Sequence, residues 1–247
     1  MTIAIIPSRY GSSRLAGKPL MAIAGKSLIQ RVYEQAQKSS TVTQTWVATD
    51  DQRIVQAVQA FGGKAILTSD TCRSGTDRVA ETANLLNLDP DEIIINIQGD
   101  QPAFHPGSLD DLIAPFARDT ETVMTTLAYK IQDPREITDP KDVKVTFDIH
   151  GSALYFSRAQ IPFPREKDFQ TDFYKHLGFY AYKKSFLDIF VSLPTGWCEE
   201  VEKLEQLRAL EFGYPIKVAV TAFDSPEIDL PEDIRRMEKK LLQSKIP

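Results

Sequence analysis

Along the first hundred positions, the spacing of apolar residues alternates between a strand-like and a helix-like pattern. Apolar residues recur at the spacing of one helix face in segments 27–38, 50–61 and 76–86. Between these segments lie short runs rich in Ile and Val, as is typical of buried strands. Strands that alternate with helices predict an α/β fold with a mostly parallel sheet. The predicted strands are Thr2–Ile6, Thr45–Thr49, Lys64–Leu67 and Glu92–Ile97.

The pattern changes after about residue 122. Three strand-like segments follow closely, at 123–129, 143–149 and 153–157, and a His150-Gly151 turn joins the last two. Short strands joined by a tight turn predict antiparallel pairing. Because exposed edge strands invite pairing with another chain, we expect this smaller antiparallel lobe to form a dimer interface.

The last fifty residues return to helical patterns. Segment 199–212 predicts one helix, segment 216–220 a strand, and Pro231 the first turn of a closing helix. At 247 residues the chain fits one domain, 1–247, with the antiparallel lobe inserted at about 122–190.

Charge and cysteine usage narrow the class of protein. A formal net charge of −5 argues against a nucleic-acid binder, whose footprint would be a broad basic face. Cys72 and Cys198 form no C-x-x-C pair, so we expect neither a disulfide framework nor a zinc site. The first residues lack a secretory pattern, and no apolar run reaches the length that crosses a bilayer. We therefore expect a cytoplasmic protein with no membrane insertion.

The loop at positions 7–20 follows the first predicted strand and is rich in cations, glycines and serines. Loops at the carboxyl ends of parallel strands are where open α/β sheets bind ligands. Glycines let backbone N–H groups approach a triphosphate, and arginine or lysine side chains add charge and directed hydrogen bonds. A solvated basic surface loop remains the alternative. The candidate phosphate-binding residues are Arg9, Gly11, Ser12, Arg14 and Lys18.

Two aspartates are candidate metal ligands. Asp100 lies just past the predicted strand 92–97, at the sheet edge expected for the phosphate loop. Mg²⁺ is typically held by one or two carboxylates together with phosphate oxygens, and Asp229 could complete such a site. The alternatives are an ordinary turn residue for Asp100 and an N-cap for Asp229, before the helix that starts at Pro231.

The segment Arg73–Arg78 lies between a strand and a helix, so its backbone donors and hydroxyls could face a nucleotide at a helix amino terminus. Capping by Ser74 and Thr76 explains the same residues structurally. Farther along, Arg158 and His176 could bind an acidic co-substrate, although a single histidine is often structural.

Several ordered motifs together resemble the 3-deoxy-D-manno-octulosonate (Kdo) cytidylyltransferases, the CMP-Kdo synthetases. They span nearly the whole chain, which makes them more specific than the first loop alone. The motifs are I-P-S-R-Y-G-S-S-R-L-A-G-K-P-L, V-A-T-D-D, S-G-T-D-R, I-N-I-Q-G-D-Q-P, A-L-Y-F-S-R, K-H-L-G and L-E-Q-L-R.

The resemblance implies a Rossmann-like nucleotidyltransferase fold, commonly dimeric, that uses CTP and Mg²⁺ to make CMP-Kdo and pyrophosphate for lipopolysaccharide assembly. It implies that the lobe at 122–190 also binds the sugar, that Lys18, Asp100 and Arg14 are catalytic, and that Asp100 and Asp229 bind Mg²⁺. The implied nucleotide-binding residues are Arg9, Gly11, Ser12, Arg14, Lys18, Ser74, Gly75, Arg78 and Gln98. The implied sugar-binding residues are Gln98, Arg158, His176 and Gln206.

Three departures from the family pattern leave the sugar open. The common Q-G-D-E-P is Q-G-D-Q-P here, the loop proline is Ala16, and the glycine-rich approach to V-D-T-P-E-D is S-P-E-I-D-L-P-E-D. These changes resemble the branch that acts on 8-amino-3,8-dideoxy-octulosonate (8-amino-Kdo). Other open alternatives are a cytidylyltransferase for a different acidic sugar, a glycosyltransferase, and a nucleotide-binding protein without catalysis.

Overall fold

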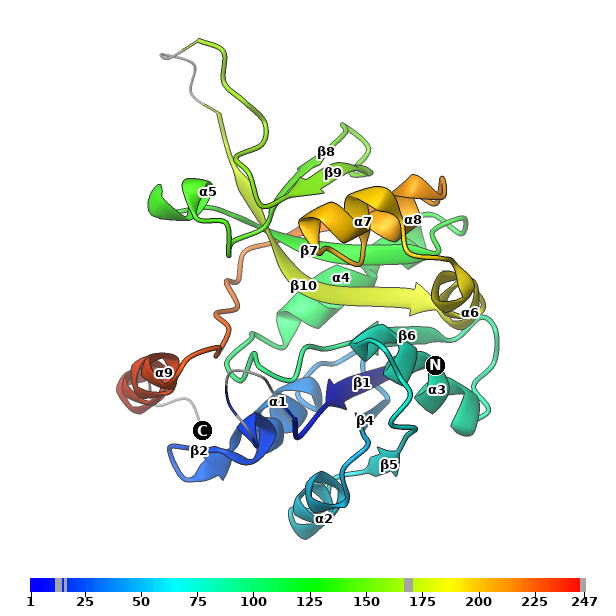
Figure 1. Cartoon of the computed structure of the whole chain (residues 1–247), viewed down its shortest axis with the longest axis vertical. Helices are drawn as coiled ribbons and strands as arrows, with labels where there is room; N and C mark the ends of the chain where they lie inside the picture. The colour runs from blue at the N-terminus through cyan, green and yellow to red at the C-terminus, as the bar shows by residue number, and fades with distance from the viewer. Residues whose placement is uncertain (12–14, 16, 167–170, 245–247) are drawn as a thin grey trace.

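The computed structural model describes residues 1–11, 15, 17–166 and 171–244 (Figure 1). Its main feature is one nine-stranded sheet. The order of seven strands along the sheet is β11-β7-β10-β6-β1-β4-β5, and the hairpin of β8 and β9 pairs with β10. The strands are β1 Thr2–Ser8, β4 Gln44–Thr49, β5 Ala65–Leu67, β6 Ile93–Asn96, β7 Met124–Lys130, β8 Lys144–Phe147, β9 Ala153–Ser157, β10 Tyr174–Lys183 and β11 Lys217–Thr221. A separate two-stranded sheet pairs β2 Ala22–Ile23 with β3 Lys26–Ser27.

The predicted mostly parallel α/β fold is confirmed. β1 pairs in parallel with β4 and β6, and β11 pairs in parallel with β7. β10 is antiparallel to both β6 and β7, so it alone runs against the other six strands of the described order. β8 and β9 form the predicted antiparallel hairpin.

Helices cover both faces of the sheet. In β1 the side chains of Ala4 and Ile6 join one buried cluster with α1 and α4, whereas Ile3 and Ile5 join the opposite cluster with α3 and α6. This alternation is what a strand buried on both faces requires. The helices are α1 Leu28–Ala36, α2 Gln52–Ala60, α3 Gly75–Leu85, α4 Gly107–Arg118, α5 Arg135–Thr138, α6 Lys184–Ser192, α7 Trp197–Glu202, α8 Leu207–Glu211 and α9 Pro231–Ser244, with the 3₁₀ helix η1 Lys18–Leu20.

The single helix predicted for 199–212 is wrong. The chain forms α7 and α8 instead, with Lys203 between them at φ 55° in the left-handed region, which ends α7. The two short helices are tied together by Glu199, whose carboxylate accepts hydrogen bonds from the Arg208 guanidinium at 2.8 and 2.5 Å. Apolar spacing alone did not reveal this break.

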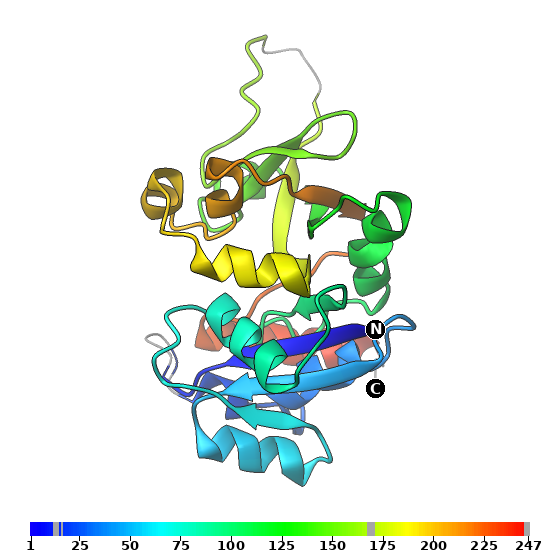
Figure 2. The same cartoon turned by 90° about the vertical axis from the view of Figure 1, so that its right-hand side faces the viewer.

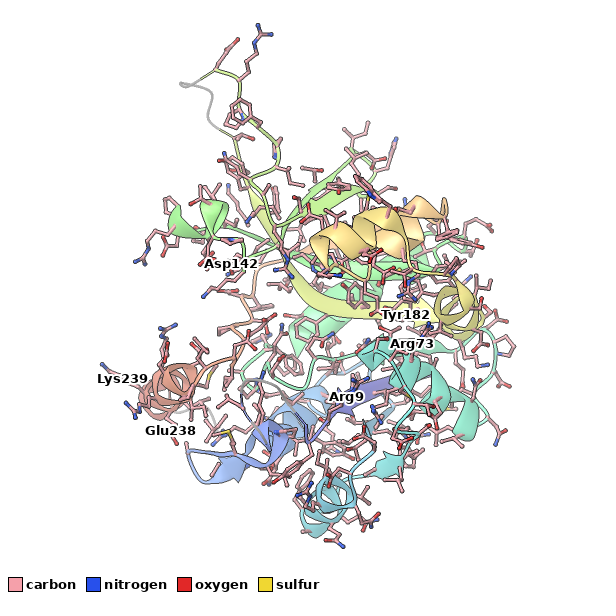
Figure 3. The ribbon with its side chains drawn as sticks, in the orientation of Figure 1. Arg9, Arg73, Asp142, Tyr182, Glu238 and Lys239 are labelled. Carbon is pink, nitrogen blue, oxygen red and sulfur yellow. The ribbon has the colours of Figure 1, made fainter. Side chains whose placement is uncertain are left out.

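The segment 122–190 contributes β7 and β10 to the sheet, and its β8–β9 hairpin joins the same sheet through the pairing of β8 with β10, beside which Figure 1 shows it (Figures 1 and 2). Its assignment as a sugar-binding and dimerisation lobe remains a prediction. The closing helix α9 returns to the amino-terminal half, where Glu238 accepts a hydrogen bond from the Ala24 N–H at 2.9 Å (Figure 3). Within the described ranges, every helix is too short or too polar to cross a membrane.

Candidate active site

Lys18 joins three distant parts of the chain at one edge of the sheet. Its ammonium donates hydrogen bonds to Asp100 Oδ2 at 2.9 Å and to Asp229 Oδ1 at 3.3 Å. Lys18 begins η1, Asp100 follows β6, and Asp229 precedes α9. The side chain of Lys18 is 13% exposed, compared with 29% for Asp100 and 40% for Asp229, so the cation lies deeper than its acidic partners. A half-buried position strengthens these ion pairs relative to surface pairs.

The local backbone explains how Lys18 reaches this position. Gly17 has φ 71°, a conformation that strains other residues, and its N–H bonds to the Tyr10 carbonyl at 2.9 Å. A Cβ at Gly17 would lie 3.2 Å from the Tyr10 ring. The loop therefore closes on itself just before Lys18 and fixes where the lysine stem begins.

The acidic side is fixed by backbone hydrogen bonds. The Ile228 N–H donates to the Asp100 carbonyl at 2.9 Å, which ties the segment before α9 to the end of β6. Asp233 Oδ2 accepts from the N–H groups of Asp229 and Leu230 at 3.0 and 2.9 Å. These bonds hold the two aspartates near each other although they lie far apart in the sequence.

A third carboxylate, Glu227, lies beside this cluster. Fully buried Gln101 donates from Nε2 to Glu227 Oε1 at 3.2 Å and to the Leu177 carbonyl at 2.8 Å, while its Oε1 accepts from Ser225 Oγ at 3.0 Å. Although Glu227 keeps exposed surface, loss of hydration at the carboxyl and repulsion from Asp100 raise the pKa of Glu227 to about 7. The cluster is thus rich in negative charge with one lysine at its centre.

The phosphate-binding candidates of the first loop are only partly described. Arg9 is exposed at the end of β1, and its Nη2 donates to the Cys72 carbonyl at 2.6 Å, next to the segment that carries Arg73 (Figure 3). Gly11 is exposed, and an added Cβ there would meet nothing within 4 Å. Ser12 and Arg14 lie outside the described residues.

Ser74 and Gly75 start α3. Ser74 and Asp77 form a capping box, since Ser74 Oγ accepts from the Asp77 N–H at 3.1 Å and Asp77 Oδ2 accepts from the Ser74 N–H at 3.2 Å. A Cβ at Gly75 would lie 3.3 Å from Pro7, so glycine lets the helix start lie against the end of β1. The structural and the nucleotide-binding explanations of these residues are therefore compatible.

Arg78 is fully buried in α3. Its Nη2 lies 2.6 Å from Asp50 Oδ2, and its Nη1 donates to Thr68 Oγ1 and to the Ser69 carbonyl. These bonds join α3 to the ends of β4 and β5. The guanidinium of Arg78 is already paired with Asp50. Its contact with a nucleotide stays a prediction.

Gln98 and His176 are both tied to the segment around the register shift of β10. Gln98 Nε2 donates to the Gly178 carbonyl at 3.2 Å, within that shift, where Gly178 has φ 74°. The Thr126 hydroxyl donates to the Phe179 carbonyl, so it accepts from His176 Nε2 at 2.8 Å. Burial lowers the pKa of His176 to about 3, which keeps the ring neutral at pH 7.

Gln206 lies in a buried polar chain that includes atoms without partners. Its Oε1 accepts from the Tyr180 hydroxyl at 2.9 Å, and Glu205 Oε2 accepts from Thr76 Oγ1 at 2.6 Å. Among the described residues, the buried atoms Gln206 Nε2, Glu205 Oε1 and Asn96 Oδ1 have no hydrogen-bond partner. Such atoms are costly unless a ligand or water satisfies them, so this region is a candidate for binding a polar ligand.

Arg158 is held at the end of β9. Its Nε donates to the Glu202 carbonyl at 2.9 Å and its Nη1 to the Pro140 carbonyl at 3.0 Å. Both of these acceptors lie outside the cluster of Lys18, Asp100 and Asp229. Arg158 thus belongs to the inserted lobe, and its contact with a sugar acid stays a prediction.

The comparison with known families decides the class of protein. A family model of cytidylyltransferases matches residues 3–218. The chain belongs to the cytidylyltransferase family. The expected resemblance to CMP-Kdo synthetases and the expected nucleotidyltransferase class are both confirmed.

Relatives of this cytidylyltransferase carry names from both branches. The 3-deoxy-manno-octulosonate cytidylyltransferase of Desulfosudis oleivorans is 59% identical over 95% of this chain and 95% of its own. The 8-amino-3,8-dideoxy-manno-octulosonate cytidylyltransferase of Shewanella frigidimarina is 52% identical over 96% and 97%. A solved structure of CMP:2-keto-3-deoxy-manno-octonic acid synthetase complexed with CTP is 41% identical, with a TM-score of 0.92 over 98% of this chain and 99% of that chain.

The donor set of the cytidylyltransferase fits a hard divalent cation. Oxygen atoms of Asp100 and Asp229 converge on one position, where the Lys18 ammonium already acts as a cation between them. Among the described residues, no group of three or more His, Cys, Asp or Glu side chains could hold a metal ion. The two aspartates would therefore share such an ion with oxygen ligands from substrate or water.

Sequence reasoning missed four polar residues of the site: Gln101, Glu227, Tyr180 and Glu205. Gln101 and Glu227 occupy two of the departures from the family pattern, and that coincidence was the available signal. Glu205 stands beside Gln206 in the motif L-E-Q-L-R, which was its available signal. Tyr180 gave no comparable signal, because its hydroxyl reaches Gln206 only through the fold.

Proposed function

We propose that this cytidylyltransferase transfers CMP from CTP to the anomeric hydroxyl of a 3-deoxy-octulosonate acid, either Kdo or 8-amino-Kdo, and releases pyrophosphate. The observation that carries the proposal is the meeting of Lys18, Asp100 and Asp229 at the edge where β1 and β6 end. The hydroxyl oxygen attacks the α-phosphorus in line and pyrophosphate leaves, so no covalent protein intermediate is needed.

The triphosphate would lie along the loop after β1. Lys18 supplies an ammonium, exposed Arg9 supplies a guanidinium at the end of β1, and Gly11 leaves room for close backbone approach. Ser12 and Arg14 belong to the same loop in the sequence, and we assign them to the phosphates with Arg14 as a second catalytic cation. Positioning and charge neutralisation supply most of the acceleration in such transfers.

The nucleoside end of CTP would lie toward α3. Ser74 and Gly75 form the amino terminus of this helix, where backbone N–H groups favour negative or polar ligand atoms. The Arg9 bond to the Cys72 carbonyl links the loop to this segment. We retain Arg78 among the residues of the nucleotide region. Its ion pair with Asp50 would hold the end of β4 in place beside α3.

Mg²⁺ is the cofactor that this acidic pair supports best. Asp100 and Asp229 would supply two carboxylate ligands, and their hard oxygen atoms suit this ion. When bound, the ion neutralises charge that develops on the transferred phosphate. Lys18 and the loop arginines remain available to hold the other phosphate oxygens.

The sugar acid would bind between β6, β10 and α8. Gln98 and Gln206 offer amide groups, and Gln206 Nε2 is a buried donor without a partner among the described residues. Neutral His176 can hydrogen-bond a hydroxyl without adding charge, since burial lowers its pKa to about 3. Arg158 would meet the sugar carboxylate from the inserted lobe, because its fork geometry matches a carboxylate.

We further propose that the enzyme is a cytoplasmic homodimer that serves lipopolysaccharide assembly. Exposed apolar side chains occur on β9 and α7, with Leu154 62% exposed, Trp197 75% and Val201 63%. The two elements are joined by the Ser157 hydroxyl, which donates to Glu202 at 2.5 Å. An apolar surface of this kind supports a subunit interface. Light scattering on the purified protein would give the mass of a dimer.

A pyrophosphate-release assay with CTP and Mg²⁺ tests the function. Kdo and 8-amino-Kdo are compared side by side, and omission of the sugar is the control. The proposal predicts release that depends on one or both sugars. CTP binding without any sugar-dependent release would reject both substrates.

A further inference from the structure

The position of Lys18 suggests a second task beyond phosphate binding. Its ammonium lies 2.9 Å from Asp100 and 3.3 Å from Asp229, and these are the same oxygen atoms that would ligate a divalent cation. Metal–oxygen bonds to Mg²⁺ are about 2.1 Å long, so an ion that bridges the two carboxylates would lie against the ammonium. The Lys18 ammonium and the metal ion therefore cannot contact these oxygen atoms at the same time.

The charges around Lys18 explain why it stays there without a nucleotide. Asp100, Asp229 and the nearby Glu227 place carboxylates around one side chain that is 13% exposed. Opposite charges attract strongly at such a half-buried position. Among the described residues, Lys18 is a cation that the protein itself provides for this acidic cluster.

The lysine can also leave once a triphosphate arrives. It carries its charge on a flexible four-carbon stem, and η1 is a single short turn that starts after Gly17. A triphosphate brings several negative charges to the loop side of the ammonium. The side chain can turn from the aspartates to the phosphates by rotation of its own bonds, without a change of the backbone.

We propose that Lys18 is the resident cation of the metal site, so that it excludes a divalent ion until CTP draws its ammonium away. This inference rests on the proposed function for the identity of the nucleotide and for the metal site at Asp100 and Asp229. Its consequence is that metal and nucleotide bind with positive coupling. By linkage, each raises the affinity for the other by the same factor, typically between about 5-fold and 150-fold.

The test is Mn²⁺ binding, measured by electron paramagnetic resonance on the full chain without nucleotide or sugar. Lys18→Met and Lys18→Gln remove the charge, so we expect Mn²⁺ to bind at least about tenfold more tightly to both than to the unsubstituted protein. Lys18→Arg keeps the charge and should bind Mn²⁺ as weakly as the unsubstituted protein. Lys26→Met is the matched control, because Lys26 pairs with Glu34 at 2.6 Å, away from Asp100.

A second readout guards against loss of folding. In thermal melts, Mn²⁺ should raise the Tm of Lys18→Met more than that of the unsubstituted protein, since a tighter ligand stabilises more. Addition of CTP should tighten Mn²⁺ binding to the unsubstituted protein and do so less in Lys18→Met. Equal or weaker Mn²⁺ binding by both uncharged variants would overturn the inference. Neither readout uses turnover. A failure of the pyrophosphate-release assay can therefore be told apart from a failure of this inference.

Discussion

Gln101 donates a hydrogen bond to Glu227 across 3.2 Å, and this contact joins two places where the sequence departs from the family pattern. Position 101 carries an amide where the common motif Q-G-D-E-P has a carboxylate, and Glu227 stands in the segment that commonly carries glycine. An amide can donate to a carboxylate, whereas a second carboxylate cannot. The amide at position 101 therefore suits the carboxylate at position 227, and the two departures depend on each other.

Gln101→Glu should destabilise the protein. It would place a second carboxylate about 3 Å from Glu227 and remove the buried donor to the Leu177 carbonyl, which costs about 2 kcal/mol or more of unfolding free energy. Urea unfolding at pH 7.5 measures the change. Adding Glu227→Gln should recover much of the loss, because the new amide at position 227 can donate to the carboxylate introduced at position 101. Unchanged stability of the single variant would contradict the coupling.

Asp100→Asn should reduce turnover while the fold is kept. The amide cannot serve as an anionic metal ligand, so we expect kcat to fall by about 100-fold or more. Pyrophosphate release gives the rate, and circular dichroism checks the fold. The control is Asp91→Asn, which removes an exposed carboxylate just before the same strand. A rate near that of the control would remove Asp100 from the mechanism.

His176 should make stability depend on pH. Burial lowers its pKa to about 3 in the folded protein, below the ordinary value of about 6.5, so the unfolded chain binds the proton first. Its contribution is therefore nearly complete above about pH 7 and is lost as the pH falls toward 3, by about 1.6 kcal/mol between pH 6.5 and 5. Urea unfolding across this range should show a shallower slope for His176→Gln than for exposed His150→Gln. Equal slopes would count against a buried neutral ring.

Arg78 and Arg53 provide a matched pair of ion pairs. Both guanidinium groups lie 2.6 Å from an aspartate, but Arg78 is fully buried and the Arg53 side chain is 58% exposed. Removal of a buried partner leaves an uncompensated charge, so Arg78→Met should cost about 3 kcal/mol of unfolding free energy. Arg53→Met should cost far less than Arg78→Met, since surface pairs contribute little. Similar losses in urea unfolding would show that burial does not decide the effect.

The sheet edge that carries the site followed from the sequence. The end of β1 and the end of β6 were predictable from apolar runs, and parallel strands bring their carboxyl ends to one edge. The meeting of Lys18 with Asp100 is a direct result of that rule. The approach of Asp229 depends on how α9 returns across the protein, which the strand pattern alone did not fix.

Other features required the folded chain. β10 escaped prediction because Lys175 and His176 interrupt its apolar pattern and Gly178 shifts its register. The arginine in S-G-T-D-R suggested a ligand contact, but its partner Asp50 lies 28 positions away and only the fold brings them together. Apolar spacing also continued across Lys203, whose left-handed backbone divides the predicted helix. Long-range partners and local backbone reversals leave little trace in periodicity.

The most decisive experiment follows the α-phosphate of CTP. CTP labelled at that phosphorus is incubated with the enzyme, Mg²⁺ and either Kdo or 8-amino-Kdo, and the products are separated. We predict that the label moves into a CMP-sugar while unlabelled pyrophosphate is released, and that Asp100→Asn slows this transfer by about 100-fold or more. Label that stays in CTP with both sugars, or that appears only as free CMP or CDP, would contradict the proposed reaction.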